Sequence, residues 1–129
     1  MDFIQWADTD KTALYIQAPQ TISDDEVKTI LRHITAMTRT VEHPIALIID
    51  RRKTLNVPRK TMISMRKVIA NHSWEQVVLI GFSMLPKMLV ETLTHLPGIF
   101  STDPIFVDTL QEAYEILDIT DPVLADTQV

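Results

Sequence analysis

Two short, uninterrupted runs of apolar residues constrain the fold of this chain more than any other feature. They read IALII at 45–49 and VVLI at 77–80. A strand with one face in water alternates apolar and polar residues, whereas a strand covered on both faces is apolar throughout. Both runs have the length of a strand, and each is followed by a segment with helical periodicity. The sequence therefore predicts parallel strands that lie between layers of helices, which is an α/β fold.

The rest of the pattern supplies the other expected elements. Residues 1–18 contain two extended stretches around the turn-forming cluster at 7–11, which predicts an N-terminal β-hairpin. Ser23 followed by Glu26 is a capping box, so a helix is expected to begin there and to reach about Thr40. The other expected elements are a helix that starts at Pro58, a helix capped by Ser83, a strand at 104–107 and a last helix capped by Asp108 with Gln111.

The expected order of elements is β-β-α-β-α-β-α-β-α. It predicts a mostly parallel, five-stranded sheet that is flanked by four helices and joined by right-handed crossovers. At 129 residues the chain has the size of one domain, which we assign to residues 1–118. Residues 119–129 are acidic and contain Pro122, so they are predicted to form a frayed tail.

The composition excludes several classes of site. The chain has no cysteine, which rules out disulfides, thiolate catalysis and zinc fingers. Its four histidines lack the spacing of metal ligands, and its two glycines cannot build a phosphate-binding loop. No metal and no cofactor are therefore expected. The N-terminus shows no export signal and no apolar run could span a bilayer, so we expect a cytoplasmic protein without a transmembrane segment.

Charge is distributed unevenly along the chain. Positions 51–67 hold seven of the twelve Lys and Arg residues and no acid, in a chain with a formal net charge of −5. Eight acids and no base follow Lys87. The sequence therefore predicts one positive region on a negative body.

Three segments of the chain resemble the STAS family, the sulphate-transporter and anti-sigma-factor-antagonist domains with their relatives of the lipid-transfer type. They are ALIID at 46–50, VVLIGFS at 77–83 and FVDTLQEAYEIL at 106–117. The resemblance covers residues 10–118. It implies a STAS-like fold and a regulatory module of the kind found in bacterial signalling.

The resemblance has one clear departure. The bacterial regulators of the family carry an Asp-Ser-Ser-Gly motif at the start of the second helix, where a partner kinase phosphorylates one serine. Counted on from Asp50, that motif would fall on residues 58–61, which read Pro-Arg-Lys-Thr. The motif is absent, and Thr54 and Thr61 are the candidate phosphoacceptors that could replace it.

The basic segment begins where an α/β sheet usually binds its ligands, at the carboxyl ends of the strands. Two helices are also expected to begin there, with free N–H groups and a partial positive charge. Our hypothesis is an anion-attracting rim that binds an acidic or phosphorylated protein partner, and the alternative is a solvated loop of charges. The candidate binding residues are Asp50, Arg51, Arg52, Lys53, Arg59, Lys60, Thr61 and Ser83.

These observations favour a non-catalytic regulatory or scaffold module that acts by protein–protein interaction through the basic loop and the start of the second helix. The first alternative is a module that holds an anionic or lipid-like small molecule between the second and third helices, where methionines could line a pocket or fill the core. The second alternative, an enzyme, needs Asp50, Ser83 and a histidine to converge. Ser83 lacks the second glycine of a nucleophile elbow and fits a helix cap.

The sequence also bears on two further kinds of partner. Nucleic acid is not expected, because no aromatic residue is interleaved with the bases between positions 51 and 67. A homodimer stays open, because the N-terminal hairpin or the methionine-bearing helices could pair with a second copy.

Overall fold

A computed structural model of the chain describes residues 4–18, 23–52, 72–81 and 104–124. Its centre is a five-stranded sheet in which the strands follow one another in chain order. The first strand is antiparallel to the second, and all other neighbours are parallel. The strands are β1 (Ile4–Trp6), β2 (Ala13–Gln17), β3 (Ala46–Asp50), β4 (Val77–Ile80) and β5 (Ile105–Val107).

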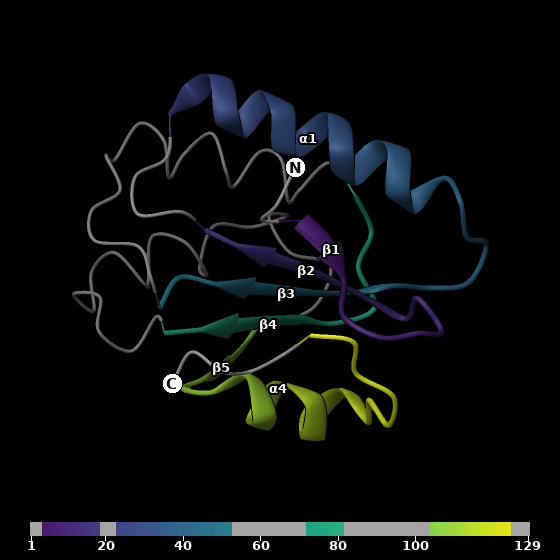
Figure 1. The fold of residues 1–129 in the computed structure, drawn as a ribbon, viewed down its shortest axis with the longest axis vertical. Coiled ribbons are helices and arrows are strands. Elements are labelled where there is room, and N and C mark those ends of the chain that lie inside the picture. The colour runs from purple at the N-terminus through teal and green to yellow at the C-terminus, as the bar shows by residue number, and fades with distance from the viewer. Residues whose placement is uncertain (1–3, 19–22, 53–71, 82–103, 125–129) are drawn as a thin grey trace.

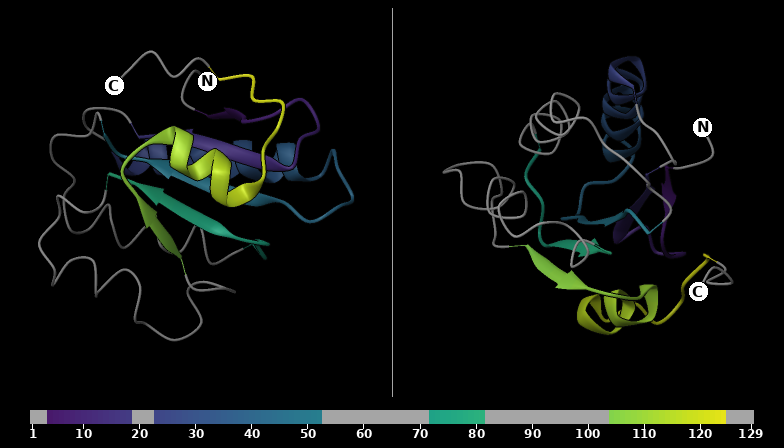
Figure 2. Two further views of the ribbon diagram at one scale, coloured as in Figure 1. Left: turned by 90° about the horizontal axis from the view of Figure 1, so that it is seen from below. Right: turned by 90° about the vertical axis from the view of Figure 1, so that its left-hand side faces the viewer.

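Two helices belong to the described residues, α1 (Asp24–Thr38) and α4 (Leu110–Leu117). They cover opposite faces of the sheet (Figures 1 and 2). This arrangement confirms an α/β fold with a mostly parallel, five-stranded sheet and an N-terminal hairpin. The helices expected from Pro58 and from Ser83 lie outside the described residues.

The two strands that contain the continuous apolar runs, β3 and β4, are buried along their whole length, as the sequence predicts. Within β2 and β3 successive side chains alternate between two apolar clusters. One cluster lies under α1 and contains Leu14, Ile16 and Ile30, whereas the other lies under α4 and contains Tyr15 and Ala113. We call these two sides of the sheet the α1 face and the α4 face.

The start of α1 agrees with the capping box in the sequence. The Ser23 hydroxyl accepts a hydrogen bond from the Glu26 N–H at 3.2 Å, and the Glu26 carboxylate accepts one from the Ser23 N–H at 3.0 Å. Both bonds satisfy N–H groups that have no partner inside the helix. The helix ends at Thr38, two residues before the predicted end.

The cap of α4 differs from the prediction by one residue. The sequence assigned it to Asp108 with Gln111, but the N-cap is Thr109, whose backbone is extended with φ −134° and ψ 157°. The Thr109 hydroxyl accepts a hydrogen bond from the Glu112 N–H at 3.1 Å. Both pairs have the spacing of a capping box, so only the backbone conformation distinguishes them.

The segment after α4 lies along the N-terminal hairpin. The Val123 N–H donates to the Ala7 carbonyl at 2.9 Å, and the Thr9 N–H donates to the Asp121 carbonyl at 3.1 Å. Ile119 and Leu124 pack on the apolar cluster of the α4 face. Backbone hydrogen bonds and apolar contacts therefore join residues 119–124 to the rest of the fold. Residues 125–129 of the predicted tail lie outside the described residues.

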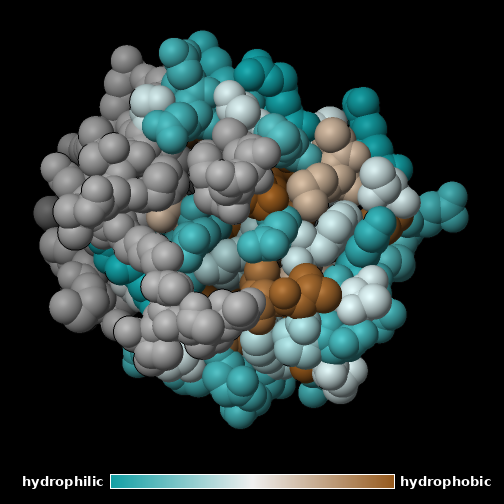
Figure 3. Space-filling view, in the orientation of Figure 1, coloured by the Kyte–Doolittle hydropathy of each residue, from teal (hydrophilic) through white to brown (hydrophobic). Residues whose placement is uncertain are grey.

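The outer surface follows from this layering. In the orientation of Figure 3, most of the visible coloured surface is hydrophilic, and hydrophobic side chains gather in the band between α1 and α4. The exposed residues of both helices are mostly polar, as expected for helices whose apolar stripe faces a sheet, and Ile116 of α4 is an exposed apolar residue.

Candidate functional site

The candidate site lies at the carboxyl ends of the parallel strands, which meet at one edge of the sheet (Figure 1). We call it the carboxyl edge. Asp50 is the last residue of β3, and its neighbours in the register are Gln17 on β2 and Ile80 on β4. Ligands of open α/β sheets usually bind outside this edge.

Asp50 carries a buried carboxylate. Only 1% of the residue is exposed. Its Oδ2 accepts a hydrogen bond from the Tyr15 hydroxyl at 2.6 Å, and its Oδ1 accepts one from the Arg52 N–H at 2.9 Å. Tyr15 reaches Asp50 because both residues point to the α4 face from neighbouring strands. The carboxylate thus has a partner on each oxygen before the guanidinium of Arg52 is considered.

Arg52 adds an ion pair to these bonds. Its Nη2 lies 2.7 Å from Oδ2 of Asp50, and its Nε lies 3.0 Å from Oδ1 and 3.1 Å from Oδ2. A guanidinium that bonds both oxygens of one carboxylate gives the strongest and most directional type of ion pair. Arg52 therefore turns back onto the residue that ends β3.

These contacts change the pKa values of both acidic partners. Burial by itself would raise the pKa of Asp50, but the hydrogen bonds from Arg52 and Tyr15 and the positive charge of Arg52 outweigh it and hold this pKa below its usual value. Burial, followed by the hydrogen bond to Asp50 and its negative charge, raises the pKa of Tyr15 well above the usual value. At neutral pH Asp50 is therefore charged and Tyr15 is neutral.

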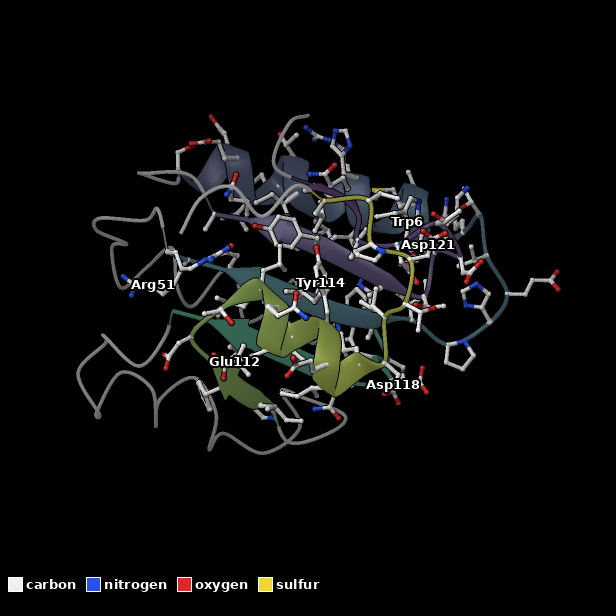
Figure 4. All side chains as sticks on the ribbon, turned by 60° about the horizontal axis from the view of Figure 1, so that its bottom comes forward. Trp6, Arg51, Glu112, Tyr114, Asp118 and Asp121 are labelled. Atoms are coloured by element: carbon white, nitrogen blue, oxygen red, sulfur yellow. The ribbon has the colours of Figure 1, made fainter. Side chains whose placement is uncertain are left out.

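Arg51 follows Asp50 directly, and two of its hydrogen bonds go to the end of β4 instead of to Asp50. Its N–H donates to the Ile80 carbonyl at 3.0 Å, and its Nη1 donates to the Gly81 carbonyl at 3.0 Å. The side chain is half-buried, and this burial lowers the pKa of Arg51. Figure 4 shows Arg51 at one end of the molecule, opposite the end that carries Asp118 and Asp121.

Gly81 connects this cluster to the next two strands. It follows β4 with φ +81°, in the left-handed region that disfavours residues with a side chain. A Cβ at this position would stand 3.0 Å from Cγ of Arg52. The Gly81 N–H donates to the Val107 carbonyl of β5 at 3.1 Å. Because Gly81 has no Cβ, the side chain of Arg52 can lie against the backbone at the end of β4.

Of the predicted site residues, the structure describes Asp50, Arg51 and Arg52 and brings them together. It joins to them Tyr15 and Gly81, which the sequence analysis did not select. The sequence grouped Arg52 with the cations of an open rim, whereas the structure pairs its guanidinium with Asp50. The remaining candidates lie outside the described residues: Lys53, Thr54, Arg59, Lys60, Thr61 and Ser83.

Within residues 4–18, 23–52, 72–81 and 104–124, no three His, Asp or Glu side chains are grouped so that they could hold a metal ion. His43 has Nδ1 at 3.0 Å from the Pro44 carbonyl, and the His72 ring packs 5.6 Å from the Trp74 ring, centroid to centroid. Each of these two histidines therefore contacts a residue close to it in the sequence, and neither belongs to the groups that bond Asp50.

Of the two described helices, neither α1 nor α4 is long and apolar enough to cross a membrane. Comparison of the sequence with protein-family models and with curated proteins found no match.

Proposed function

We propose that this protein is a non-catalytic regulatory or scaffold module that binds a protein partner at the carboxyl edge of its sheet. The observation that carries this proposal is the pair of neighbouring arginines at the end of β3. Arg52 closes a buried ion pair with Asp50, and Arg51 lies at the end of the molecule opposite Asp118 and Asp121. A strand end that holds two neighbouring arginines, with five further bases after it in the sequence, suits recognition of an acidic or phosphorylated segment.

The chemistry of the same cluster favours binding over catalysis. A general base needs a carboxylate that can take up a proton near the working pH, and a general acid needs a group that can release one. Asp50 has a lowered pKa and bonds on both oxygens, and Tyr15 has a raised pKa. These groups stabilise the strand end instead of transferring protons.

The resemblance to the STAS family extends the proposal to the kind of module and its location. A STAS-like module would have two more helices, between β3 and β4 and between β4 and β5, and would act in the cytoplasm. The sequential order of the five strands and the position of Asp50 at the end of β3 support this assignment. The regulatory role would then depend on docking, because the serine motif of the bacterial regulators is absent.

Affinity capture from the native cell tests the proposal. The tagged chain would be compared with Arg51→Glu, which reverses the charge at the carboxyl edge, and with Lys11→Glu, which makes the same charge change in the hairpin turn at the other end of β2. We expect mass spectrometry to identify a protein that the parent chain and Lys11→Glu retain and that Arg51→Glu loses. If every captured protein binds all three forms equally, the carboxyl edge is not the docking surface.

A further inference from the structure

Residues 119–124 join two parts of the chain that are distant in sequence. We call them the strap, because they run from the end of α4 to the turn of the N-terminal hairpin (Figure 2). Pro122 of the strap lies opposite Asp8 in an antiparallel bridge, and backbone hydrogen bonds of 2.9 Å and 3.1 Å flank this bridge. The strap thus pairs with the hairpin in the way that an additional strand would.

The strap buries little of its own surface. Ile119 and Leu124 are partly buried where they pack on the apolar cluster of the α4 face. Residues 120–123 between them are exposed, and Val123 is 54% exposed. Segments with few buried apolar contacts open at a lower free energy than the core of a protein. We therefore expect the strap to open while the sheet stays folded.

The hairpin has bonds of its own that do not involve the strap. The Ala7 N–H donates to the Ala13 carbonyl at 2.8 Å, and the Asp8 carboxylate accepts from the Thr12 N–H at 2.8 Å. When the strap opens, the hairpin therefore keeps its shape, and the Ala7 carbonyl and the Thr9 N–H lose their partners in the strap. Unpaired backbone groups on an ordered edge are a template for a segment of another chain.

The turn from α4 into the strap depends on Asp118. This residue has φ +53° and ψ 38°, in the left-handed region that glycine occupies most easily. The Ile119 N–H donates to the Tyr114 carbonyl at 2.9 Å, as in the Schellman motif that often ends a helix with a glycine. Residues with a Cβ are disfavoured in this conformation, aspartate less than most. A hinge that opens at Asp118 therefore releases some strain.

We propose that the strap is exchangeable: it turns about Asp118 and pairs with the hairpin of a second copy of this chain, so that two chains form a dimer. The second copy is the partner that fits, because its strap carries the residues that already pair with this hairpin. Exchange keeps the contacts of the strap, now between two chains, and lets Asp118 leave the left-handed region. The strap lies at the end of the molecule away from Arg51, and the inference does not rest on the proposed function (Figure 4).

The absence of cysteine from the chain permits a direct test. Thr9→Cys and Asp121→Cys together place two thiols at neighbouring exposed positions of the hairpin and the strap. Oxidised glutathione then links them within one chain where the strap is closed and between two chains where it is exchanged, and a non-reducing gel separates the two products. The control combines Thr9→Cys with Glu115→Cys, an exposed position of α4, and measures the links that random collisions form.

Two substitutions at the hinge remove the same charge but differ in how well they accept a positive φ. Glycine in Asp118→Gly favours the closed strap, whereas the β-branched residue in Asp118→Thr disfavours it. A strap acts on its own hairpin at an effective concentration of about a millimolar, so links between chains should appear as the protein concentration approaches that value. We expect Asp118→Thr to lower the concentration at which half of the links join two chains by about tenfold, and Asp118→Gly to raise it.

Each result bears on the inference. If no link forms within the chain at micromolar concentration, the strap does not lie on the hairpin and the inference is overturned. It is also overturned if links between chains are no more abundant than in the control pair, or if Asp118→Thr and Asp118→Gly behave alike. Should the cysteines alter the circular dichroism spectrum, sedimentation equilibrium of the cysteine-free Asp118 variants replaces the gel. A dimer that Asp118→Thr forms at a lower concentration than Asp118→Gly then supports exchange, and equal masses at all concentrations oppose it.

Discussion

The Tyr15 hydroxyl on β2 donates a hydrogen bond of 2.6 Å to the carboxylate of Asp50 at the end of β3, across 35 positions of sequence. Both side chains are buried on the α4 face of the sheet. The bond ties the carboxyl ends of two neighbouring strands, and the ion pair with Arg52 lies directly beside it. Hydrogen bonds and an ion pair therefore hold Asp50, the residue that directly precedes the basic segment.

Tyr15→Phe should lower the free energy of unfolding. The substitution keeps the ring and removes the hydroxyl, so the buried Asp50 carboxylate loses one donor. We expect a cost of about 1–3 kcal/mol, the range for a buried polar group that loses a partner. Urea denaturation at neutral pH measures it. An unchanged midpoint would mean that the hydroxyl bond adds nothing to stability.

The same variant tests the raised pKa of Tyr15. In the unfolded chain a tyrosine ionises near pH 10, whereas the folded protein holds this hydroxyl neutral to higher pH. A raised folded pKa contributes stability that is complete below the unfolded pKa and is lost as the pH rises toward the folded pKa. Unfolding free energies between pH 8 and pH 11 should therefore fall more steeply for the parent chain than for Tyr15→Phe. Parallel profiles would contradict the shift.

Arg52→Gln should be among the most destabilising substitutions in the described residues. It leaves the Asp50 carboxylate buried without its counter-ion, for which we expect a loss of about 3–5 kcal/mol. Adding Asp50→Asn removes the buried charge, so the double variant should recover part of the loss. Arg32→Gln, on the exposed side of α1, serves as the control and should change stability by about 0.5 kcal/mol or less. Denaturant unfolding of the parent chain and the three variants measures these free energies of unfolding. If Arg52→Gln lowers the free energy of unfolding by less than about 1 kcal/mol, this ion pair contributes no more than an ordinary surface pair.

Local signals predicted much of this fold, because each depends on residues that are close in sequence. The apolar runs gave β3 and β4, and Ser23 with Glu26 gave the start of α1. The cap of α4 was placed one residue early, because Asp108 with Gln111 and Thr109 with Glu112 have equal spacing. Residues 119–124 could not be placed from sequence, because their hydrogen bonds go to Ala7 and Thr9 at the other end of the chain.

The candidate site shows the same limit. The position of Asp50 at a strand end follows from the run that precedes it, and the basic cluster is visible by inspection. The inward turn of Arg52 depends on Tyr15, which lies on β2, and on Gly81, which directly follows β4. Once the β2–β3 register is known, the alternation of side chains puts Tyr15 on the same face as Asp50. The sequence alone does not give that register.

Thr109→Ala tests the observed cap of α4. The Thr109 hydroxyl accepts from the Glu112 N–H, and its removal leaves that donor without its capping partner. We expect a loss of about 1 kcal/mol, the typical cost of removing an N-cap. Gln111→Ala, which alters the cap that the sequence predicted, is the matched control and should be nearly neutral, since alanine is a good helix former. Thermal unfolding compares the two, and a larger effect at Gln111 would restore the cap at Asp108.

Gly81→Ala tests whether the close approach of β4 to Arg52 requires a glycine. The residue has φ +81°, a backbone conformation that costs about 1–2 kcal/mol for a residue with a Cβ. The new methyl group would also meet Cγ of Arg52 at 3.0 Å and its backbone N at 3.3 Å, so Arg52 would have to move. We therefore expect a total loss of about 2–3 kcal/mol in the free energy of unfolding.

The two causes of this loss, backbone strain at Gly81 and displacement of Arg52, can be separated in the Arg52→Gln background. If Arg52 is displaced in Gly81→Ala, its pairing with Asp50 is already weakened, and Arg52→Gln should then cost less than it does in the parent chain. Equal costs of Arg52→Gln in the two backgrounds would mean that the glycine serves the turn after β4 and does not support the ion pair.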